Sequence, residues 1–203
     1  TEGFGDRSEI EDLHSLINVT PETISSKEIS YFSSLINSLS DEEYDNLLAY
    51  YVVNSADHDN LRATLNLLGV ELSEIQCVMH SPSDEYDGTT PLTEAYDATM
   101  YIYDSSRSGY TNRRISVAYQ LLEKERKPAS YDAVIMYFNP NQATFVSYTC
   151  DSNYSSLKDG SQAFNGTLVF NFYDELAKDN FSYSTIELDP NINGSDLAIS
   201  AVW

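Results

Sequence analysis

Residues 24–52 read ISSKEISYFSSLINSLSDEEYDNLLAYYV, and they indicate the architecture of the N-terminal part of the chain. Ser25 is followed three positions later by Glu28, and Ser40 by Glu43. Both pairs match the capping box, in which the serine hydroxyl accepts the glutamate N–H and the glutamate carboxylate accepts the serine N–H. Apolar residues follow each box at the spacing of one helix face. The stretch therefore predicts two consecutive helices.

The same periodicity continues on both sides of this stretch. Residues 7–18 place apolar side chains at i, i+3 and i+7, which is typical of a helix with one buried face. A shorter helix is predicted from about Asp59 to Gly69, because glycine commonly ends a helix. Residues 1–72 should thus hold about four short helices.

Beyond residue 72 the pattern becomes that of strands and loops. Residues 131–138 and 143–150 are rich in β-forming side chains, and Asn139-Pro140-Asn141-Gln142 between them has the composition of a turn. Together they predict a β-hairpin, and residues 81–91 read as an acidic loop. Further strands are predicted at residues 96–103, 181–188 and 196–203, and residues 167–173 read either as a strand or as the start of a helix.

One segment of the C-terminal part has the pattern of a helix. Thr111 to Lys127 is predicted to be helical, with Ile115, Ala118, Tyr119 and Leu122 facing inward. The predicted fold class is therefore α+β, with a helical N-terminal part packed on a mostly antiparallel β-sheet that one basic helix crosses. We expect a helical part over residues 1–72 and an α+β part over residues 73–203, which could form one continuous domain.

The predicted basic helix and its approach hold six of the 11 basic residues of the chain, namely Arg107, Arg113, Arg114, Lys124, Arg126 and Lys127. We interpret these side chains as partners for the acidic half of the same molecule. The alternative is a polar interface to another protein. A nucleic-acid site is disfavoured, because the net charge of −21 opposes the approach of a polyanion.

The negative charge is concentrated in the first half of the chain. Residues 1–100 contain 20 acidic and 3 basic side chains, which leaves a charge of −17 there. Asp41, Glu42 and Glu43 are typical of a helix start, where a carboxylate interacts favourably with the helix dipole. Residues 63–106 contain no lysine or arginine, so a surplus of carboxylates remains. Such a field attracts basic surfaces and repels nucleic acid and anionic membranes.

The function that this surplus favours is that of a non-enzymatic binding protein, such as an inhibitor, an immunity-like protein or a charge mimic, that docks on a basic protein partner. Carboxylates steer the association, and tyrosine supplies rigid contact area. The first predicted partner-binding patch consists of Asp84, Glu85, Tyr86, Asp87, Glu94, Tyr96 and Asp97.

An alternative hypothesis is a secreted or cell-surface protein with a structural, adhesive or toxin-like role. Cys77 and Cys150 are its disulfide candidates, and glycosylation sequons occur at Asn18, Asn153, Asn165, Asn180 and Asn193. The chain opens on Thr1, which indicates removal of a leader or a tag and leaves both secreted and cytoplasmic locations open. No apolar run is long enough to span a bilayer, so we expect no membrane insertion.

Metal sites are weakly indicated. Asp189, Asn191 and Asn193 match the start of a calcium loop, although Ser200 stands where a bidentate glutamate is needed. A second partial calcium match runs from Ser83 to Glu94. Cys77 and His80 have a spacing seen in zinc sites, with His58 or Cys150 to complete the set.

No sequence signature specifies a reaction. The serine-hydrolase elbow, the zinc-protease helix, the paired-cysteine motif and the phosphate-binding loop are all absent. A cysteine nucleophile with a histidine base and a pair of carboxylates for glycoside hydrolysis are conceivable, but no local pattern supports either. We therefore expect a protein that is not an enzyme and needs no cofactor.

A third functional hypothesis, beside the binding protein and the secreted protein, treats the acidity as adaptation to high salt.

Overall fold

Four helices form the N-terminal part, and two antiparallel sheets follow them, which confirms the predicted α+β class. The computed structural model describes residues 7–80, 98–121, 132–177, 180–191 and 198–202. The helical part comprises α1 (Arg7–Ser15), the 3-10 helix η1 (Leu16–Asn18), α2 (Ser26–Ser38), α3 (Asp41–Asn54) and α4 (His58–Leu67).

The predicted capping boxes are both present. At the start of α2, the Ser25 N–H donates to the Glu28 carboxylate over 2.8 Å, and the Glu28 N–H donates to the Ser25 hydroxyl over 3.2 Å. Ser40 and Glu43 repeat these two hydrogen bonds at the start of α3, also over 2.8 and 3.2 Å. The sharp turn between the two helices is thus stabilised by local side-chain hydrogen bonds.

The strands form a five-stranded sheet in the order β1-β2-β3-β8-β5 and a four-stranded sheet in the order β6-β7-β4-β9. All of the pairings are antiparallel. The elements are β1 (Ser73–His80), β2 (Ala98–Asp104), β3 (Arg113–Leu121), β4 (Asp132–Phe138), β5 (Ala143–Cys150), β6 (Ser155–Leu157), the 3-10 helix η2 (Ala163–Asn165), β7 (Thr167–Phe172), α5 (Asp174–Ala177), β8 (Phe181–Pro190) and β9 (Ile199–Val202).

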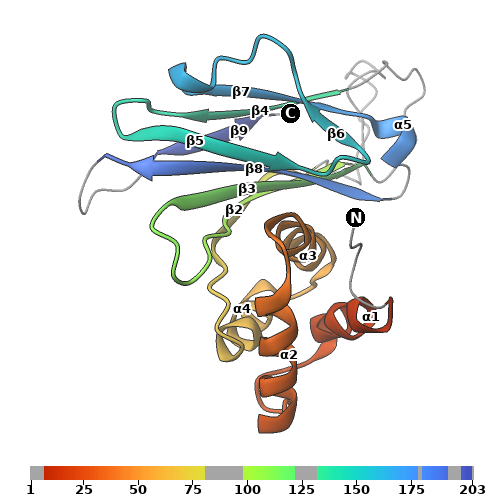
Figure 1. Ribbon diagram of the computed structural model, residues 1–203. Helices are drawn as coiled ribbons and strands as arrows, with labels where there is room; N and C mark the ends of the chain where they lie inside the picture. Colours follow the sequence, from red (N-terminus) through yellow and green to blue (C-terminus); the bar gives the residue numbers. More distant parts are fainter. Residues whose placement is uncertain (1–6, 81–97, 122–131, 178–179, 192–197, 203) are drawn as a thin grey trace.

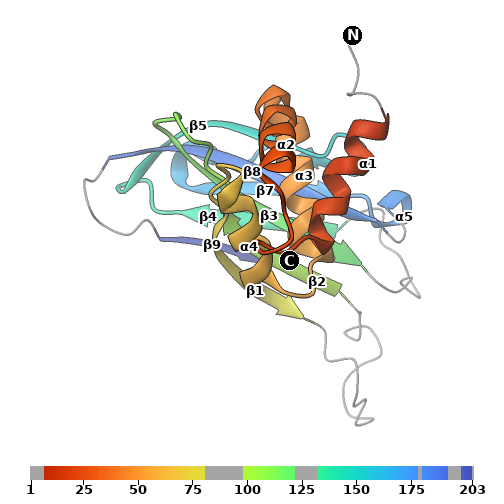
Figure 2. The same cartoon turned by 90° about the horizontal axis from the view of Figure 1, so that it is seen from below.

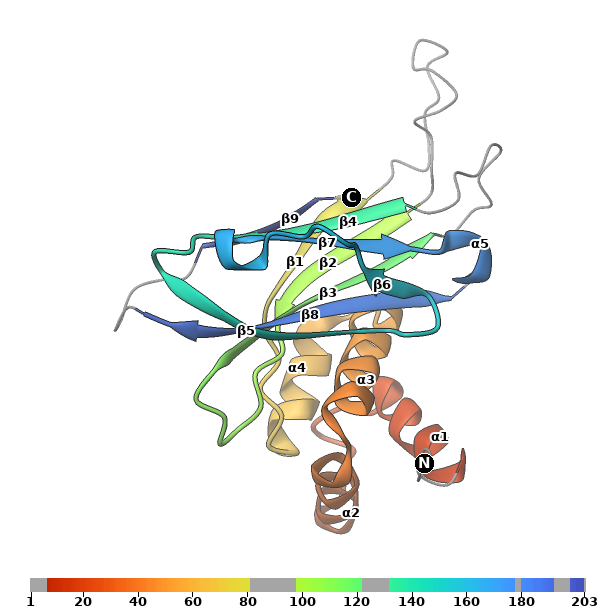
Figure 3. The ribbon, with the colours of Figure 1, turned by 45° about the horizontal axis from the view of Figure 1, so that its top comes forward.

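These elements stack in three layers. Helices α1–α4 cover one face of the five-stranded sheet, and the four-stranded sheet covers its other face (Figure 1). Figure 2 looks at the helices from below, with the strands behind them, and Figure 3 shows the two sheets one above the other. The middle strands of the five-stranded sheet, β2, β3 and β8, are therefore buried on both faces, whereas the edge strands β1 and β5 are partly exposed. Because successive residues of a strand point to opposite faces, β3 sends Ala118 into the helix-side core and Val117 and Tyr119 into the core between the sheets.

The predicted basic helix from Thr111 to Lys127 is wrong. Its described part is β3 (Arg113–Leu121), which lies between β2 and β8 in the centre of the five-stranded sheet. A strand that is covered on both faces carries apolar residues on both, so its alternation is weak and its apolar positions also fit a helix face. Residues 122–127 lie outside the described residues.

The predicted hairpin between residues 131 and 150 is also wrong, although both strands and the turn exist. The Gln142 N–H donates to the Asn139 carbonyl over 2.9 Å, as turn chemistry predicts. However, β4 pairs with β7 and β9, whereas β5 pairs with β8. The turn carries the chain from one sheet to the other, so both strands contribute to the same core from opposite sides.

The other strand predictions agree with the structure in most respects. The segments at 96–103, 181–188 and 196–203 overlap with β2, β8 and β9. Of the two alternatives for residues 167–173, the strand is present as β7, and the short helix α5 begins after it at Asp174. Strands β1 and β6 were not predicted. The proposed boundary at residue 72 coincides with the start of β1, and the helices share an apolar core with Tyr103, Ala118 and Tyr183 of the sheet.

Candidate functional site

The surface of the helical layer is strongly acidic. Between residues 8 and 77, nine carboxylates are exposed, against only two exposed basic side chains, Lys27 and Arg62. The exposed carboxylates are those of Glu11, Asp12, Glu22, Glu28, Glu42, Asp57, Asp59, Glu71 and Glu74. Part of the negative charge of the first half of the sequence is thus displayed on the helical layer and on the adjoining start of β1.

Three arginines do not neutralise this surface, because each is paired with a carboxylate of the same chain: Arg107 in the loop between β2 and β3, and Arg113 and Arg114 in β3. Arg107 lies 3.1 Å from Asp41 and places its guanidinium 4.4 Å from the centre of the Tyr44 ring. Arg114 contacts Asp45, and Arg113 forms an ion pair with Asp104. The predicted internal pairing with the acidic half is therefore confirmed for Arg107 and Arg114. Lys124, Arg126 and Lys127 lie outside the described residues.

Arg114 and Asp45 form the centre of a buried polar contact between α3 and the sheet. The Arg114 guanidinium also lies 3.3 Å from Glu187, and the Thr149 hydroxyl donates to Asp45 over 2.7 Å. Burial raises the pKa of the Asp45 carboxyl, and the Arg114 charge opposes that rise. With both groups sequestered, this ion pair joins two layers and is not available to a ligand.

The local sequence at the end of α4 creates a groove on the acidic layer. Gly69 adopts a φ of +78°, its N–H donates to Asn66 over 3.1 Å, and the Val70 N–H donates to Leu65 over 3.0 Å. This is the Schellman arrangement, in which a left-handed glycine reverses the chain after a helix. Residues 70–73 consequently run back alongside α4 before β1 begins.

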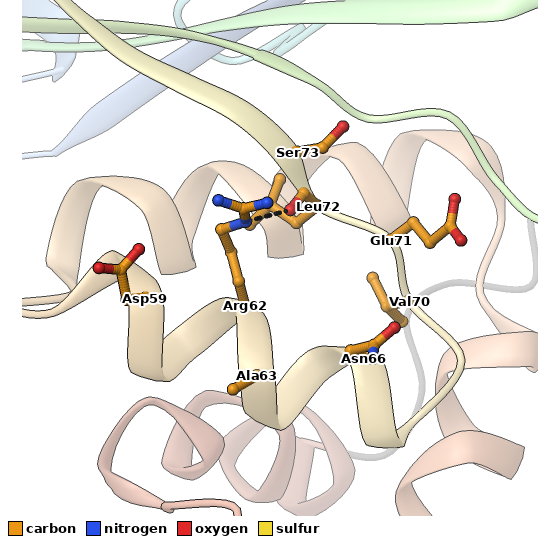
Figure 4. Close-up of a pocket in the computed structure, with 8 residues that line it drawn as sticks. All are labelled: Asp59, Arg62, Ala63, Asn66, Val70, Glu71, Leu72 and Ser73. Atoms are coloured by element: carbon orange, nitrogen blue, oxygen red, sulfur yellow. Dashed lines mark hydrogen bonds between the residues drawn. The ribbon is translucent and has the colours of Figure 1, made fainter.

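The groove between α4 and the returning segment has a volume of about 410 Å³ (Figure 4). Helix α4 contributes Asp59, Arg62, Ala63 and Asn66, and residues 70–73 form the opposite side. Val70 and Leu72 also line the groove, but their side chains are almost fully buried in the core of the helical part. The Arg62 Nε–H donates to the Leu72 carbonyl over 2.9 Å, which holds the two sides together.

Figure 4 shows Asp59 and Glu71 on opposite sides of Arg62 in this groove. Asp57 and Glu74 lie two residues before Asp59 and three residues after Glu71 in sequence, and both are exposed. The groove was not predicted from the sequence. The available signal was Gly69 followed by the alternation of Val70, Glu71 and Leu72, which indicates a reversal with one buried face.

The predicted partner-binding patch cannot be compared with the structure. Asp84, Glu85, Tyr86, Asp87, Glu94, Tyr96 and Asp97 all lie outside the described residues. The patch stays a prediction. Its neighbours in sequence, β1 and β2, pair with each other at the edge of the five-stranded sheet, so the segment connects two adjacent strands.

The disulfide prediction for Cys77 and Cys150 is wrong. Cys77 belongs to β1 and Cys150 to β5, the two opposite edge strands of the five-stranded sheet. Four strand spacings separate them, roughly 19 Å, whereas a disulfide needs Cα atoms within about 7 Å. The same separation prevents the two cysteines from sharing a zinc ion. His58 Nε2 is hydrogen-bonded to the Val52 carbonyl at 2.8 Å, and the side chain of His80 lies outside the described residues.

Cys150 is not placed as a nucleophile. Burial raises the pKa of its thiol to about 11, and its sulfur donates to the Ser155 carbonyl over 3.6 Å. A thiol in this state is mostly protonated near neutral pH, whereas nucleophilic cysteines need a lowered pKa. Close by, the hydroxyls of Tyr119, Ser155, Ser182 and Ser184 form a buried network between the two sheets. This network, which satisfies polar groups within the core, was not predicted from the sequence.

The calcium prediction is only partly covered by the structure. Asp189 is the penultimate residue of β8, Asn191 accepts a hydrogen bond from the Thr144 hydroxyl over 3.2 Å, and Asn193 lies outside the described residues. The whole of the second candidate loop, Ser83 to Glu94, lies outside them as well. Within the part of the chain that the structure describes, no three His, Cys, Asp or Glu side chains converge to hold a metal ion.

Among the described residues, every helix is too short or too polar to cross a bilayer. Comparison of the chain with protein-family models, with curated proteins and with solved structures finds no match. The site must therefore be interpreted from its own geometry and charge.

Proposed function

We propose that this protein is a non-enzymatic binding protein whose acidic helical layer docks on a basic protein partner. The observation that carries this proposal is the excess of nine exposed carboxylates over two exposed basic side chains between residues 8 and 77. A surface of one sign concentrates a partner of the opposite sign and accelerates its association.

The internal pairing of the arginines supports the same proposal. Arg107 and Arg114 each use a carboxylate of α3, but these are Asp41 and Asp45, which are only partly exposed or buried. Exposed carboxylates such as those of Asp59 and Glu71 form no ion pair with a described residue, so they remain for intermolecular contacts. A polyanion such as nucleic acid would meet repulsion over this layer, so the partner class is a basic protein.

The test begins with capture of partners from native extract on the immobilised protein at low and high salt. We expect the retained proteins to be basic and to be released by salt, because exposed charges are screened within about 8 Å at physiological ionic strength. Neutral or acidic proteins that stay bound at high salt would contradict the proposal.

Charge reversal then tests the surface with one purified captured partner. Asp59→Lys with Glu71→Lys should lower the association rate and flatten its salt dependence. Asp159→Lys with Asp189→Lys is the matched control, since both residues are exposed in the sheet layers and the change in net charge is identical. Equal effects of the two pairs would show that docking does not use the helical layer.

A further inference from the structure

The outer face of the four-stranded sheet carries apolar side chains that belong to neither core of the protein. Alternate residues of β4 and β7, such as Val134, Met136 and Phe170, point inward and form the core between the sheets. The intervening residues point outward, and each of them is partly or fully exposed. They are Ala133, Ile135 and Tyr137 of β4 and Thr167, Val169 and Asn171 of β7. Neither core cluster includes them.

The register of the sheet joins these side chains into one surface. Ile135 lies opposite Val169, and Tyr137 lies between Thr167 and Ser200 of β9. Such opposed side chains are only about 5 Å apart at their Cβ atoms. With Ser200, the six outward residues form what we call the outer patch. The solvent face of an antiparallel sheet is normally polar, so an apolar outer face indicates a surface that another molecule covers.

The outer patch is uncharged, although the chain has a net charge of −21. Among the side chains that the structure describes, the outward positions of β4, β7 and β9 hold no Asp, Glu, Lys or Arg. A basic partner would find no carboxylate there, and a polyanion would find no lysine or arginine. The patch therefore suits a partner surface that is itself apolar and uncharged.

A second copy of this chain offers such a surface. Two molecules that each carry −21 repel each other least where no carboxylates meet face to face. The outer patch meets this condition, because the acidic helices α1–α4 lie beyond the five-stranded sheet, on the far side of the molecule (Figure 1). Contact of the two patches about a two-fold axis places the acidic layers at opposite ends of the dimer.

We propose that the outer patch binds the outer patch of a second copy and forms a two-fold symmetric dimer. The two sheets would pack face to face about 10 Å apart, as in a β-sandwich. The four strands offer at most roughly 400 Å² per copy, given a strand spacing of about 4.8 Å and a length of about 20 Å. Stable interfaces bury about 800 Å² per partner, so this dimer is reversible. The inference does not depend on the proposed function, which uses the opposite layer.

Sedimentation velocity over a range of protein concentrations, at low and at high salt, tests the inference. We expect the dimer fraction to rise with concentration and to rise further with salt, because salt screens the repulsion between the two copies. Binding to a basic partner should respond to salt in the opposite direction. A protein that stays monomeric under all of these conditions, or a dimer that salt weakens, would overturn the inference and leave the proposed function standing.

Matched variants locate the interface. Tyr137 is 39% exposed in the outer patch, and Tyr148 is 42% exposed on β5 of the other sheet. Tyr137→Glu should weaken self-association by at least about tenfold, because it places a charge in an uncharged contact. Tyr148→Glu adds the same charge outside the patch and should have a much smaller effect. An equal or larger effect of Tyr148→Glu would assign self-association to the β5 edge and overturn the inference.

A conservative pair of changes guards against effects on folding. Ile135→Thr with Val169→Thr keeps β-branched side chains in both strands and adds no charge, so the sheet should be preserved. The loss of apolar contact should weaken self-association by about three- to tenfold. Unchanged self-association would contradict the proposal. So would the loss of a different captured protein in place of the dimer, because it would assign the outer patch to another partner.

Discussion

Arg114 Nη2 donates to Asp45 Oδ2 over 2.5 Å, and the two side chains are only 3% and 0% exposed. The pair connects β3 to α3 across 69 residues of sequence. Asp45 Oδ1 and Arg114 Nε have no hydrogen-bond partner among the described residues, so this buried contact is only partly satisfied. Such a pair is costly to break on one side, because the remaining charge stays buried without its partner.

The first prediction concerns this pair. Arg114→Met should lower the free energy of unfolding by about 3–5 kcal/mol, since it leaves the Asp45 carboxylate uncompensated. The double variant Arg114→Met with Asp45→Leu should recover part of that loss. Urea denaturation at neutral pH measures both. A double variant that is less stable than Arg114→Met would contradict the prediction.

Acidic pH should also reduce the loss of stability that Arg114→Met causes. Burial already raises the pKa of Asp45 and the Arg114 charge opposes this, so removal of Arg114 lets the pKa rise further. A carboxyl whose folded pKa is raised binds its proton more tightly in the folded state, so its stabilising contribution grows as the pH falls. The stability gap to the wild-type protein should therefore narrow from about pH 7 to about pH 5. A constant gap would refute this coupling.

Asp151 provides a second pH-dependent contribution. Burial raises the pKa of its carboxyl, although the Asn153 N–H donates to Oδ1 over 3.1 Å. The stabilising contribution of this carboxyl is complete below its pKa in the unfolded state, and it is lost as the pH rises through its higher pKa in the folded state. The Asp151→Asn variant has no carboxyl at this position that could ionise. The unfolding free energy of this variant minus that of the wild-type protein should therefore increase between about pH 4 and about pH 7. Denaturation curves across this range measure the difference, and a flat difference would contradict the assignment.

The two cysteines should differ in reactivity. Cys77 is exposed, whereas burial raises the pKa of Cys150 to about 11. At pH 7.5 Cys150 should react with iodoacetamide at least about tenfold more slowly than Cys77, because the thiolate is the reacting species. Peptide mass spectrometry over time separates the two rates, and Cys150→Ser identifies the slow site. Equal rates would show that the Cys150 thiol is not sequestered.

Two glycines with the same backbone conformation allow a controlled test of packing. Gly160 and Gly166 both have a φ of +85°, but an added Cβ would overlap the Phe138 carbonyl oxygen only at Gly166. Gly160→Ala should cost about 1 kcal/mol from the left-handed conformation alone, and Gly166→Ala about 2–4 kcal/mol. Thermal or urea denaturation measures both, and a smaller cost at Gly166 than at Gly160 would contradict this reading.

The features that depend on contacts within a few residues could be predicted from the sequence alone. The hydrogen bonds of Ser25 with Glu28 and of Ser40 with Glu43 span three positions, so their pattern could be recognised without the fold. The same is true of Gly69, which ends α4, and of the turn at Asn139. The acidity of the first hundred residues likewise follows directly from composition.

Which strands pair, and which side chains pack against each face of a strand or helix, depends on the complete fold. Residues 113–121 fit a helix or a strand until β2 and β8 bind them on both sides, and a tight turn at Asn139 does not specify which sheet β5 joins. The separation of Cys77 from Cys150 and the contact of Arg114 with Asp45 are set by the same strand order. The groove beside α4 arises in the same way, because Val70 and Leu72 are buried only once the helices pack together. Such contacts join residues far apart in the chain, so their free energies depend on the complete fold and leave no local pattern.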